Sequence, residues 1–258
     1  MIYLYGLIEL REGALAMPEG LTRLPGVTGP VSVTDCAGLG LIHGAHDGAE
    51  ILPRRRLLLA HAKVLEASMG AGAVLPMRFG MTSSSTDEVA RLIGRSRDAI
   101  RAAFARVRGH VELGVRVTAA EDDALRAALS ASPELAAAHA RLAAGRAGDH
   151  FAKVDFGRAL GELVGRRRQL AQKQLLAALK GHAASHVLKA PETDFEVLRA
   201  EFLVPETGLQ TFSDALEDTV AALGFTAEGD CTAQIIGPGP AFHFVNISLA
   251  SDPAEAAA

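Results

Sequence analysis

The stretch AVLPMRFGM, residues 73–81, is the most strand-like apolar run of the sequence, yet it contains two residues that a buried strand avoids. Pro76 has no backbone N–H to donate, so it is confined to edge strands, strand ends and bulges. Arg78 carries a charge that is rarely buried without a partner. Side chains alternate along a strand, so Arg78 is expected to point away from Met77 and Phe79. We therefore predict an edge or bulged strand here, with Met77 and Phe79 packed inward.

The segments around this strand alternate between strand and helix patterns. Apolar, β-branched and aromatic runs predict the strands, and apolar positions at helical spacing predict the helices. In order, the predicted elements are a strand at 2–10, a loop to about Pro30, a hairpin over 31–44, a helix from Pro53 to Ser68, the strand at 73–79, a helix from Ser85 to Gly109 and a strand at 110–117. The inward face of the first helix is expected to comprise Leu57, Leu58, His61, Val64, Leu65 and Ser68. This order predicts an N-terminal α+β domain at residues 1–119, a ferredoxin-like split βαβ variant with an added strand.

The second half of the chain has a different composition and predicts a C-terminal α+β domain with long helices at residues 120–250. From about 120 to 190 the chain is rich in Ala, Leu, Arg and Gln, which predicts an almost wholly helical segment, broken near Gly145 and Gly148. The elements predicted to follow are a strand at 195–204, a helix at 211–224, two strands around Gly237–Pro240 and a disordered tail at 251–258.

Composition argues against several classes of protein. The 258 residues are 49% apolar, which is ample for a folded core, and the net charge of −4 gives no basic footprint for nucleic acid. No apolar run approaches the roughly 18 residues that a membrane span needs. Cys36 and Cys231 belong to no CxxC pair, so we predict no disulfide framework and a cytoplasmic location. Nucleic acid and lipid membrane are therefore not expected as partners.

The residues give no convincing catalytic, cofactor-binding or metal-binding site. His43 and His46 lack a third ligand at a diagnostic spacing, which favours a solvated loop. His182 and His186 are four residues apart on a predicted helix, but the glutamate of a zinc-dependent catalytic motif is missing. No Ser-His-Asp motif, paired-carboxylate motif or phosphate-binding loop is present. The residues alone therefore predict a protein that is not an enzyme and has no cofactor and no metal.

Two blocks of sequence carry a resemblance to a known family. VLPMRFG at 74–80 resembles the LPxRFG signature of the gas vesicle protein GvpL/GvpF family, and GPGPAFHFV at 237–245 resembles its C-terminal GPWPPYxFV block. Further stretches match in the same order along the chain, namely YLYGL (3–7), HAKVLEA (61–67), VELGVRV (111–117) and FEVLRAEFLV (195–204). The resemblance spans nearly the whole chain. The C-terminal block departs from the pattern, with Gly239, Ala241 and Phe242 where Trp, Pro and Tyr are usual.

The resemblance implies two α+β domains, the first ferredoxin-like in kind, in a protein required to build the gas-filled shell that provides buoyancy. It implies an assembly factor that binds the small hydrophobic shell protein during nucleation, with other gas vesicle accessory proteins as further partners. It also implies a location at the gas vesicle, within the cytoplasm. The family brings no catalytic residues that could be assigned to this chain.

The candidate partner-binding or domain-seam residues come from the two blocks. They are Pro76, Arg78, Phe79, Gly237, Pro238, Pro240, Phe242 and Phe244. We expect Arg78 to pair with a carboxylate at the domain seam or on a partner, and an arginine that only ties the two domains together is the alternative. We expect the turn at 237–240 to present Phe242 or Phe244 near a surface.

Two other classes of function stay open at this point. A ferredoxin-like nucleic-acid-binding protein would need a basic sheet face with exposed aromatic residues, and the aromatic content of 5% argues against it. A small-molecule enzyme with a site between the domains would need a deep pocket with convergent polar groups, for which the sequence supplies no set of residues.

Overall fold

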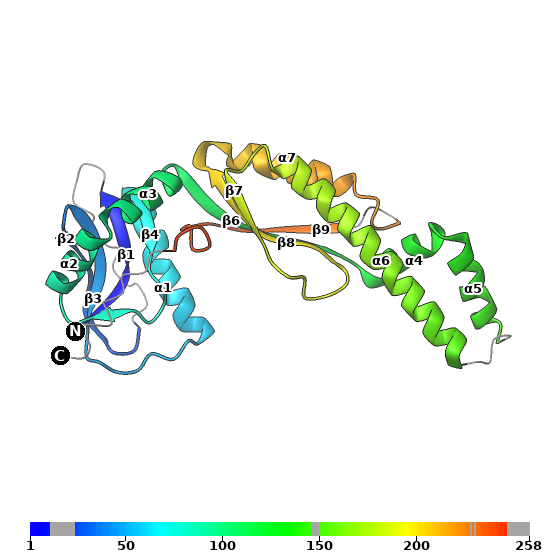
Figure 1. The fold of residues 1–258 in the computed structure, drawn as a ribbon, viewed down its shortest axis with the longest axis horizontal. Helices are drawn as coiled ribbons and strands as arrows, with labels where there is room; N and C mark the ends of the chain where they lie inside the picture. Colours follow the sequence, from blue (N-terminus) through cyan, green and yellow to red (C-terminus); the bar gives the residue numbers. More distant parts are fainter. Residues whose placement is uncertain (11–23, 146–149, 228, 230, 247–258) are drawn as a thin grey trace. The chain divides into compact units, whose positions relative to one another are not determined.

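The computed structural model describes residues 1–10, 24–145, 150–227, 229 and 231–246 (Figure 1). Most of the predicted loop after the first strand, and the predicted tail at 251–258, lie outside the described residues. The chain divides into two compact units. The first contains Met1–Glu112 and the described residues from Pro238 onward, and the second is Leu113–Gly237.

This division differs from the predicted boundary after residue 119 because the chain comes back to its first unit. Residues 238–246 were predicted in the second domain, whereas their side chains bond to the first unit. His243 contacts Glu112, and Asn246 contacts Arg78. Hydrophobic periodicity in the sequence does not indicate such a return. The sequence therefore predicted residues 238–246 in the same domain as the residues that precede them.

The first unit is built on an antiparallel sheet with strand order β2-β3-β1-β4. Its strands are β1 (Ile2–Leu10), β2 (Val27–Cys36), β3 (Leu39–His46), β4 (Gly72–Pro76) and β5 (Thr82–Ser83), the last pairing with the start of β1. Both β3 and β4 run antiparallel to β1, so they are parallel to each other, and α1 (Arg55–Ser68) connects them. This is a split βαβ unit of the predicted kind, with β2 as the added strand, and the α+β class is confirmed. The strand predicted at 110–117 was expected in this domain, but it pairs in the second sheet instead.

Helices cover both faces of this sheet. Ile42 packs in one core with residues of α1, whereas Leu39 lines a cavity with residues of α2 (Thr86–Arg95) and α3 (Arg97–Val107). Positions 39 and 42 differ in parity, so they face opposite sides of β3. Figure 1 accordingly shows α1 on one side of the sheet and α2 and α3 on the other. The open sheet face that a ferredoxin-like nucleic-acid binder uses is therefore covered.

Two details of the predicted helices are wrong. The single helix predicted over 85–109 is two helices, because the backbone of Ser96 leaves the helical region at φ −103° and ψ 15°. Its predicted start is right: the Ser85 side chain accepts a hydrogen bond from the Glu88 backbone N–H at 3.2 Å. On α1, Leu58 was expected to face inward but is 44% exposed.

The second unit holds a sheet with strand order β7-β8-β6-β9. These strands are β6 (His110–Ala119), β7 (Ser185–Leu188), β8 (Glu196–Pro205) and β9 (Cys231–Gly239). The helices are α4 (Glu121–Ser130), α5 (Pro133–Ala143), α6 (His150–Leu179) and α7 (Leu209–Ala221). Residues of α4, α6 and α7 pack with β8 in one core, in which the rings of Phe202 and Phe212 pack edge to face with centroids 5.1 Å apart. Helix α5 has no buried residue and lies outside this core.

Three predictions for this half need correction. The helical region ends at Leu179, and residues 185–188 form a strand because they pair with β8. His182 and His186 therefore do not share a helix, and the His186 ring instead stacks on Phe202. The turn predicted at 237–240 is also misplaced, since β9 continues to Gly239 and the chain turns over residues 242–244 instead.

Candidate partner-binding site

A buried chain of hydrogen bonds holds the segment Met77–Gly80. The Tyr3 hydroxyl donates to His61 Nδ1 at 2.9 Å, and His61 Nε2–H donates to the Met77 carbonyl at 3.1 Å. The Gly80 backbone N–H in turn donates to the Tyr3 hydroxyl oxygen at 3.1 Å. A carbonyl can only accept, so the proton of the neutral imidazole sits on Nε2, and every group in the chain has a partner. Tyr3 and His61 thus fix both ends of the segment.

Burial keeps the Tyr3 and His61 side chains of this hydrogen-bond chain uncharged. His61 is 3% exposed, and burial lowers its pKa to about 4. Burial also raises the pKa of Tyr3 to about 12. The Tyr5 ring stacks on His61 with centroids 5.3 Å apart, and Phe79 contacts the same imidazole edge to face at 5.9 Å. Both nitrogens of His61 are engaged and out of reach of solvent, so the arrangement positions backbone and offers no base for catalysis.

The close approach of β4 to β1 explains the glycine of the YLYGL stretch. Gly6 lies opposite Pro76 in the register, and a Cβ at Gly6 would lie 2.6 Å from the Leu75 carbonyl oxygen. The last sheet bond runs from the Met77 backbone N–H to the Tyr5 carbonyl at 2.9 Å. Because β4 is at the end of the strand order, Pro76 costs no bond to a further strand.

We predict that Gly6→Ala destabilises the first unit by about 1–3 kcal/mol, because the added methyl group has to push β4 away from β1. Urea unfolding followed by tyrosine fluorescence checks this. The matched control is Gly94→Ala, since a Cβ at Gly94 meets no atom within 4 Å. Equal urea midpoints for Gly6→Ala and Gly94→Ala would contradict the close approach of β4 to β1 at Gly6.

The side chains of the RFG motif lie as follows. Met77 is 7% exposed, Phe79 is half-buried against the core of the α1 side, and Arg78 is exposed. Arg78 Nη2 donates to Asn246 Oδ1 at 3.3 Å. The partner of Arg78 within the described residues is thus a side-chain amide, and the carboxylate partner predicted from the sequence is not found there.

The C-terminal block follows its own pattern of burial. Gly237 and Pro238 are exposed on β9, and Pro240 is buried just beyond the strand. Phe242 is 37% exposed, whereas Phe244 is 5% exposed and lies under the Arg106 guanidinium, 5.7 Å from the ring centroid. Of the two rings expected near a surface, Phe242 is the exposed one.

Two contacts of this block involve residues to which sequence reasoning gave no role. Glu112 accepts hydrogen bonds from the His243 backbone N–H at 2.8 Å and pairs with His243 Nδ1 at 2.7 Å. Asn246 lies just past the block and contacts Arg78. The available signal in the sequence was Glu112, a carboxylate on a half-buried strand. Such a residue is expected to have a partner, but the sequence does not identify which residue that partner is.

Among the described residues, no helix combines the length and the apolar character that crossing a bilayer requires.

The fold and these contacts define a two-unit α+β protein in which an exposed arginine segment meets a distant C-terminal block on the first unit. The model of the family described as gas vesicle synthesis protein GvpL/GvpF matches residues 1–246. The chain belongs to this family, which is a family of gas vesicle proteins and not of enzymes. Its role is therefore that of a gas vesicle accessory protein.

Relatives and solved structures agree with this assignment. The chain is 27% identical to gas vesicle protein F of Streptomyces sp. (strain CB03234) over 94% of this chain and 98% of that protein. It is 28% identical to gas vesicle protein F of Microcystis aeruginosa (strain PCC 7806) over 84% and 87%. The crystal structure of GvpF from Anabaena sp. PCC7120 matches with a TM-score of 0.79 at 22% identity, covering 96% of this chain and 98% of that one. This structural likeness shows the shared fold.

Proposed function

We propose that this chain binds the small hydrophobic gas vesicle shell protein while the shell nucleates, and that it does so with the first unit. The observation that supports this most is the fixed, exposed Arg78 segment. A buried tyrosine and a buried histidine hold the backbone on both sides of Arg78, while the guanidinium stays open to a partner. Rigid presentation lowers the entropic cost of binding.

Exposed leucines on α1, the helix that contacts this segment through His61, supply the apolar surface that a hydrophobic partner needs. Leu58 and Leu59 on α1 are 44% and 53% exposed. His61, in the same part of α1, bonds to the Met77 carbonyl, so these leucines lie within about one helical turn of a residue that touches the RFG segment. Two neighbouring exposed leucines on the same unit as an exposed arginine suit the capture of an apolar segment with a polar edge.

The double variant Leu58→Ser/Leu59→Ser is expected to retain at least about tenfold less shell protein than the parent, because two apolar side chains no longer become buried on binding. The experiment co-expresses the tagged chain with the shell protein and measures the shell protein that co-purifies per folded molecule. The matched control is Val154→Ser/Leu170→Ser on α6, where the original side chains are 53% and 62% exposed.

If the two double variants retain equal amounts of shell protein, the α1 surface formed by Leu58 and Leu59 is ruled out as the binding surface. If the folded parent chain retains no shell protein at all, direct binding has to be abandoned. The chain would then act through other gas vesicle accessory proteins, which the same co-expression would reveal when they are added one at a time.

A further inference from the structure

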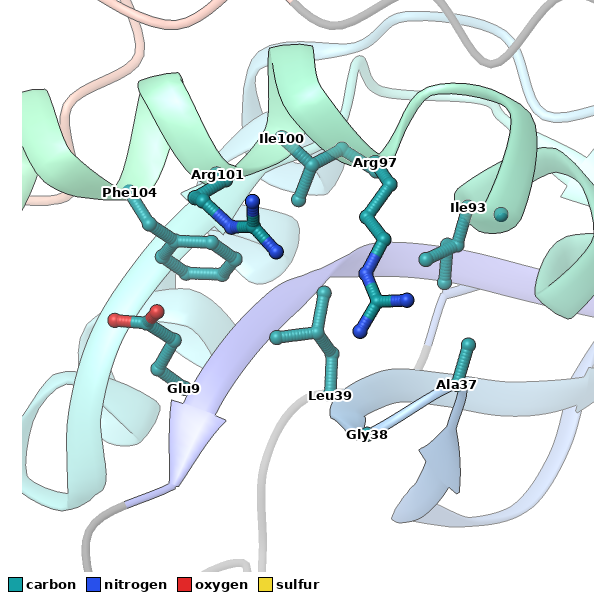
Figure 2. A pocket seen from close by; sticks show the side chains of 10 residues that line it. Glu9, Ala37, Gly38, Leu39, Ile93, Arg97, Ile100, Arg101 and Phe104 are labelled. Carbon is teal, nitrogen blue, oxygen red and sulfur yellow. The ribbon is translucent and has the colours of Figure 1, made fainter.

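A small cavity lies on the opposite side of the first sheet from α1. Its volume is about 220 Å³, and it opens between α2–α3 and the turn that joins β2 to β3. The apolar part of the wall comes from Leu39, Ile93, Ile100 and Phe104. Figure 2 shows the side chains of Arg97 and Arg101 extending from α3 toward the strands, one on either side of Ile100. The cavity thus combines an apolar wall with two guanidinium groups.

The positive charge of these arginines is largely uncompensated. Glu9, at one end of the cavity, is already engaged, because Arg108 donates to its two carboxylate oxygens at 2.9 Å and 2.8 Å. Arg101 reaches Asp98 only at 3.8 Å, and the Asp98 carboxylate is fully exposed, so water screens this pair. Within the described part of the chain, Arg97 has no ion pair. An anion entering the cavity would therefore meet two available guanidinium groups.

The size of the cavity limits what can occupy it. Sites for drug-sized molecules usually measure about 300–1,000 Å³, so this cavity suits one or two side chains. Guanidinium groups match the planar fork of a carboxylate, and an apolar wall favours an aliphatic neighbour. Arginines beside a concave apolar surface are also typical of the few residues that dominate protein–protein binding.

The turn at the mouth carries backbone strain. Ala37 has φ +58°, and it is the non-glycine residue with positive φ in the described residues. Gly38 beside it has φ +83°. Strained residues gather where the chain holds a particular shape for binding. Ala37 and Gly38 both line the cavity, and Figure 2 shows them below Arg97.

We propose that this cavity docks an acidic, aliphatic segment of a partner protein, in which a carboxylate side chain binds Arg97 and Arg101 and a neighbouring Leu or Ile fills the apolar wall. This site is separate from the α1 surface proposed for the shell protein, since the two lie on opposite sides of the sheet. The first unit would then have two faces for two partners, and either proposal can fail without the other.

The test uses the full chain, labelled with ¹⁵N, and the peptide acetyl-Ala-Leu-Glu-Leu-Ala-amide. The expected result is a saturable shift of the Gly38 and Gly94 amide signals, and an affinity at least about tenfold higher than that of the peptide with Gln in place of Glu. Arg97→Gln/Arg101→Gln should remove this preference, whereas Arg55→Gln/Arg56→Gln, at exposed positions on α1, should keep it.

A second variant blocks the cavity without removing charge. Gly94 lines it, and a Cβ at that position meets nothing within 4 Å, so Gly94→Leu should fill the space in a folded protein. We expect this variant to lose peptide binding at an unchanged or raised Tm, since leucine favours a helix more than glycine does. Gly161→Leu on α6 is the control for the substitution itself. Equal affinity for the Glu and Gln peptides, unchanged binding by Gly94→Leu, or hexanoate binding as tightly as the peptide would each overturn the proposal.

Discussion

Lowering the pH from about 6.5 to about 4 is expected to remove about 3 kcal/mol from the unfolding free energy of the first unit through His61 alone. Burial lowers the pKa of His61 from 6.5 to about 4 in the folded protein. Between these values the unfolded chain binds a proton at His61 that the folded chain does not bind. Stability therefore falls as the pH falls through this window, and it returns as the pH rises.

The sequence offers a clean probe for this effect. The chain has two tyrosines and no tryptophan, and both tyrosines are buried on β1. Tyrosine fluorescence thus reports on the first unit when urea unfolding is followed at pH 7, 5.5 and 4.5. Other groups in the chain also respond to pH. The quantity to compare is therefore the slope of the unfolding free energy against pH, measured for the parent chain and for His61→Phe. The variant should lose about 2.5 kcal/mol of the pH dependence between pH 7 and pH 4.5.

Tyr3→Phe is the matched control for the hydrogen-bond partner. It removes the hydroxyl that donates to His61 but leaves the imidazole buried. Since burial is the main cause of the lowered pKa, this variant should keep the pH slope while it loses some stability at pH 7. If the unfolding free energies of the parent chain and of His61→Phe change equally with pH, the burial of a neutral His61 in this hydrogen-bond chain is contradicted.

The second large effect is expected in the second unit, at a fully buried carboxylate. Glu196 on β8 has no exposure, and its Oε1 lies 2.6 Å from Nε of Arg116 on β6. Its other oxygen accepts a hydrogen bond from the Glu192 backbone N–H at 2.5 Å. The Glu192 carboxylate in turn contacts Arg116 at 3.0 Å and Arg199 at 2.5 Å. Arg116 is therefore the direct cationic partner of a buried anion.

Arg116→Ala should cost about 2–3 kcal/mol, because it leaves the Glu196 carboxylate buried without its counter-ion. The value is below the roughly 3–5 kcal/mol usual for a fully buried pair, since the Arg116 side chain is 40% exposed. The second unit carries most of the long helices, so urea unfolding followed by far-UV circular dichroism measures the change. Arg116→Ala/Glu196→Gln should recover part of the loss, because the remaining side chain is neutral.

An exposed pair provides the comparison. Arg158 and Asp155 are three residues apart on α6 at 3.0 Å, with side chains 71% and 68% exposed. Arg158→Ala should therefore cost less than about 0.5 kcal/mol. A loss of similar size in Arg116→Ala and Arg158→Ala would show that Glu196 does not depend on Arg116.

The sequence predicts the fold well where periodicity is strong. The split βαβ unit follows from alternating strands and from apolar helix faces, and both survive in the structure. Prediction fails where tertiary pairing overrides local preference. His186 lies in a stretch that continues a helical composition, yet residues 185–188 pair with β8. The helix predicted over 85–109 is interrupted at Ser96, although no proline in the sequence indicates a break there.

The candidate site is harder to predict because its contacts join distant residues. The sequence places His61 on an inward face, but it does not say that Tyr3 and Met77 are what His61 meets. Arg78 and Asn246 are 168 residues apart, and their contact depends on the return of the chain to the first unit. Family resemblance pointed to the two blocks, whereas the contacts that their residues make within the chain required the structure.

The measurement that tests the proposed role of Arg78 most directly compares two variants that break the same hydrogen bond. Arg78→Ala removes the guanidinium, whereas Asn246→Ala removes the amide that Arg78 contacts and leaves the guanidinium in place. Shell protein that co-purifies with each tagged variant is measured per folded molecule. If Arg78 contacts the shell protein, Arg78→Ala loses retention and Asn246→Ala keeps it. Equal retention by the two variants would contradict the proposal and assign Arg78 to holding the C-terminal block.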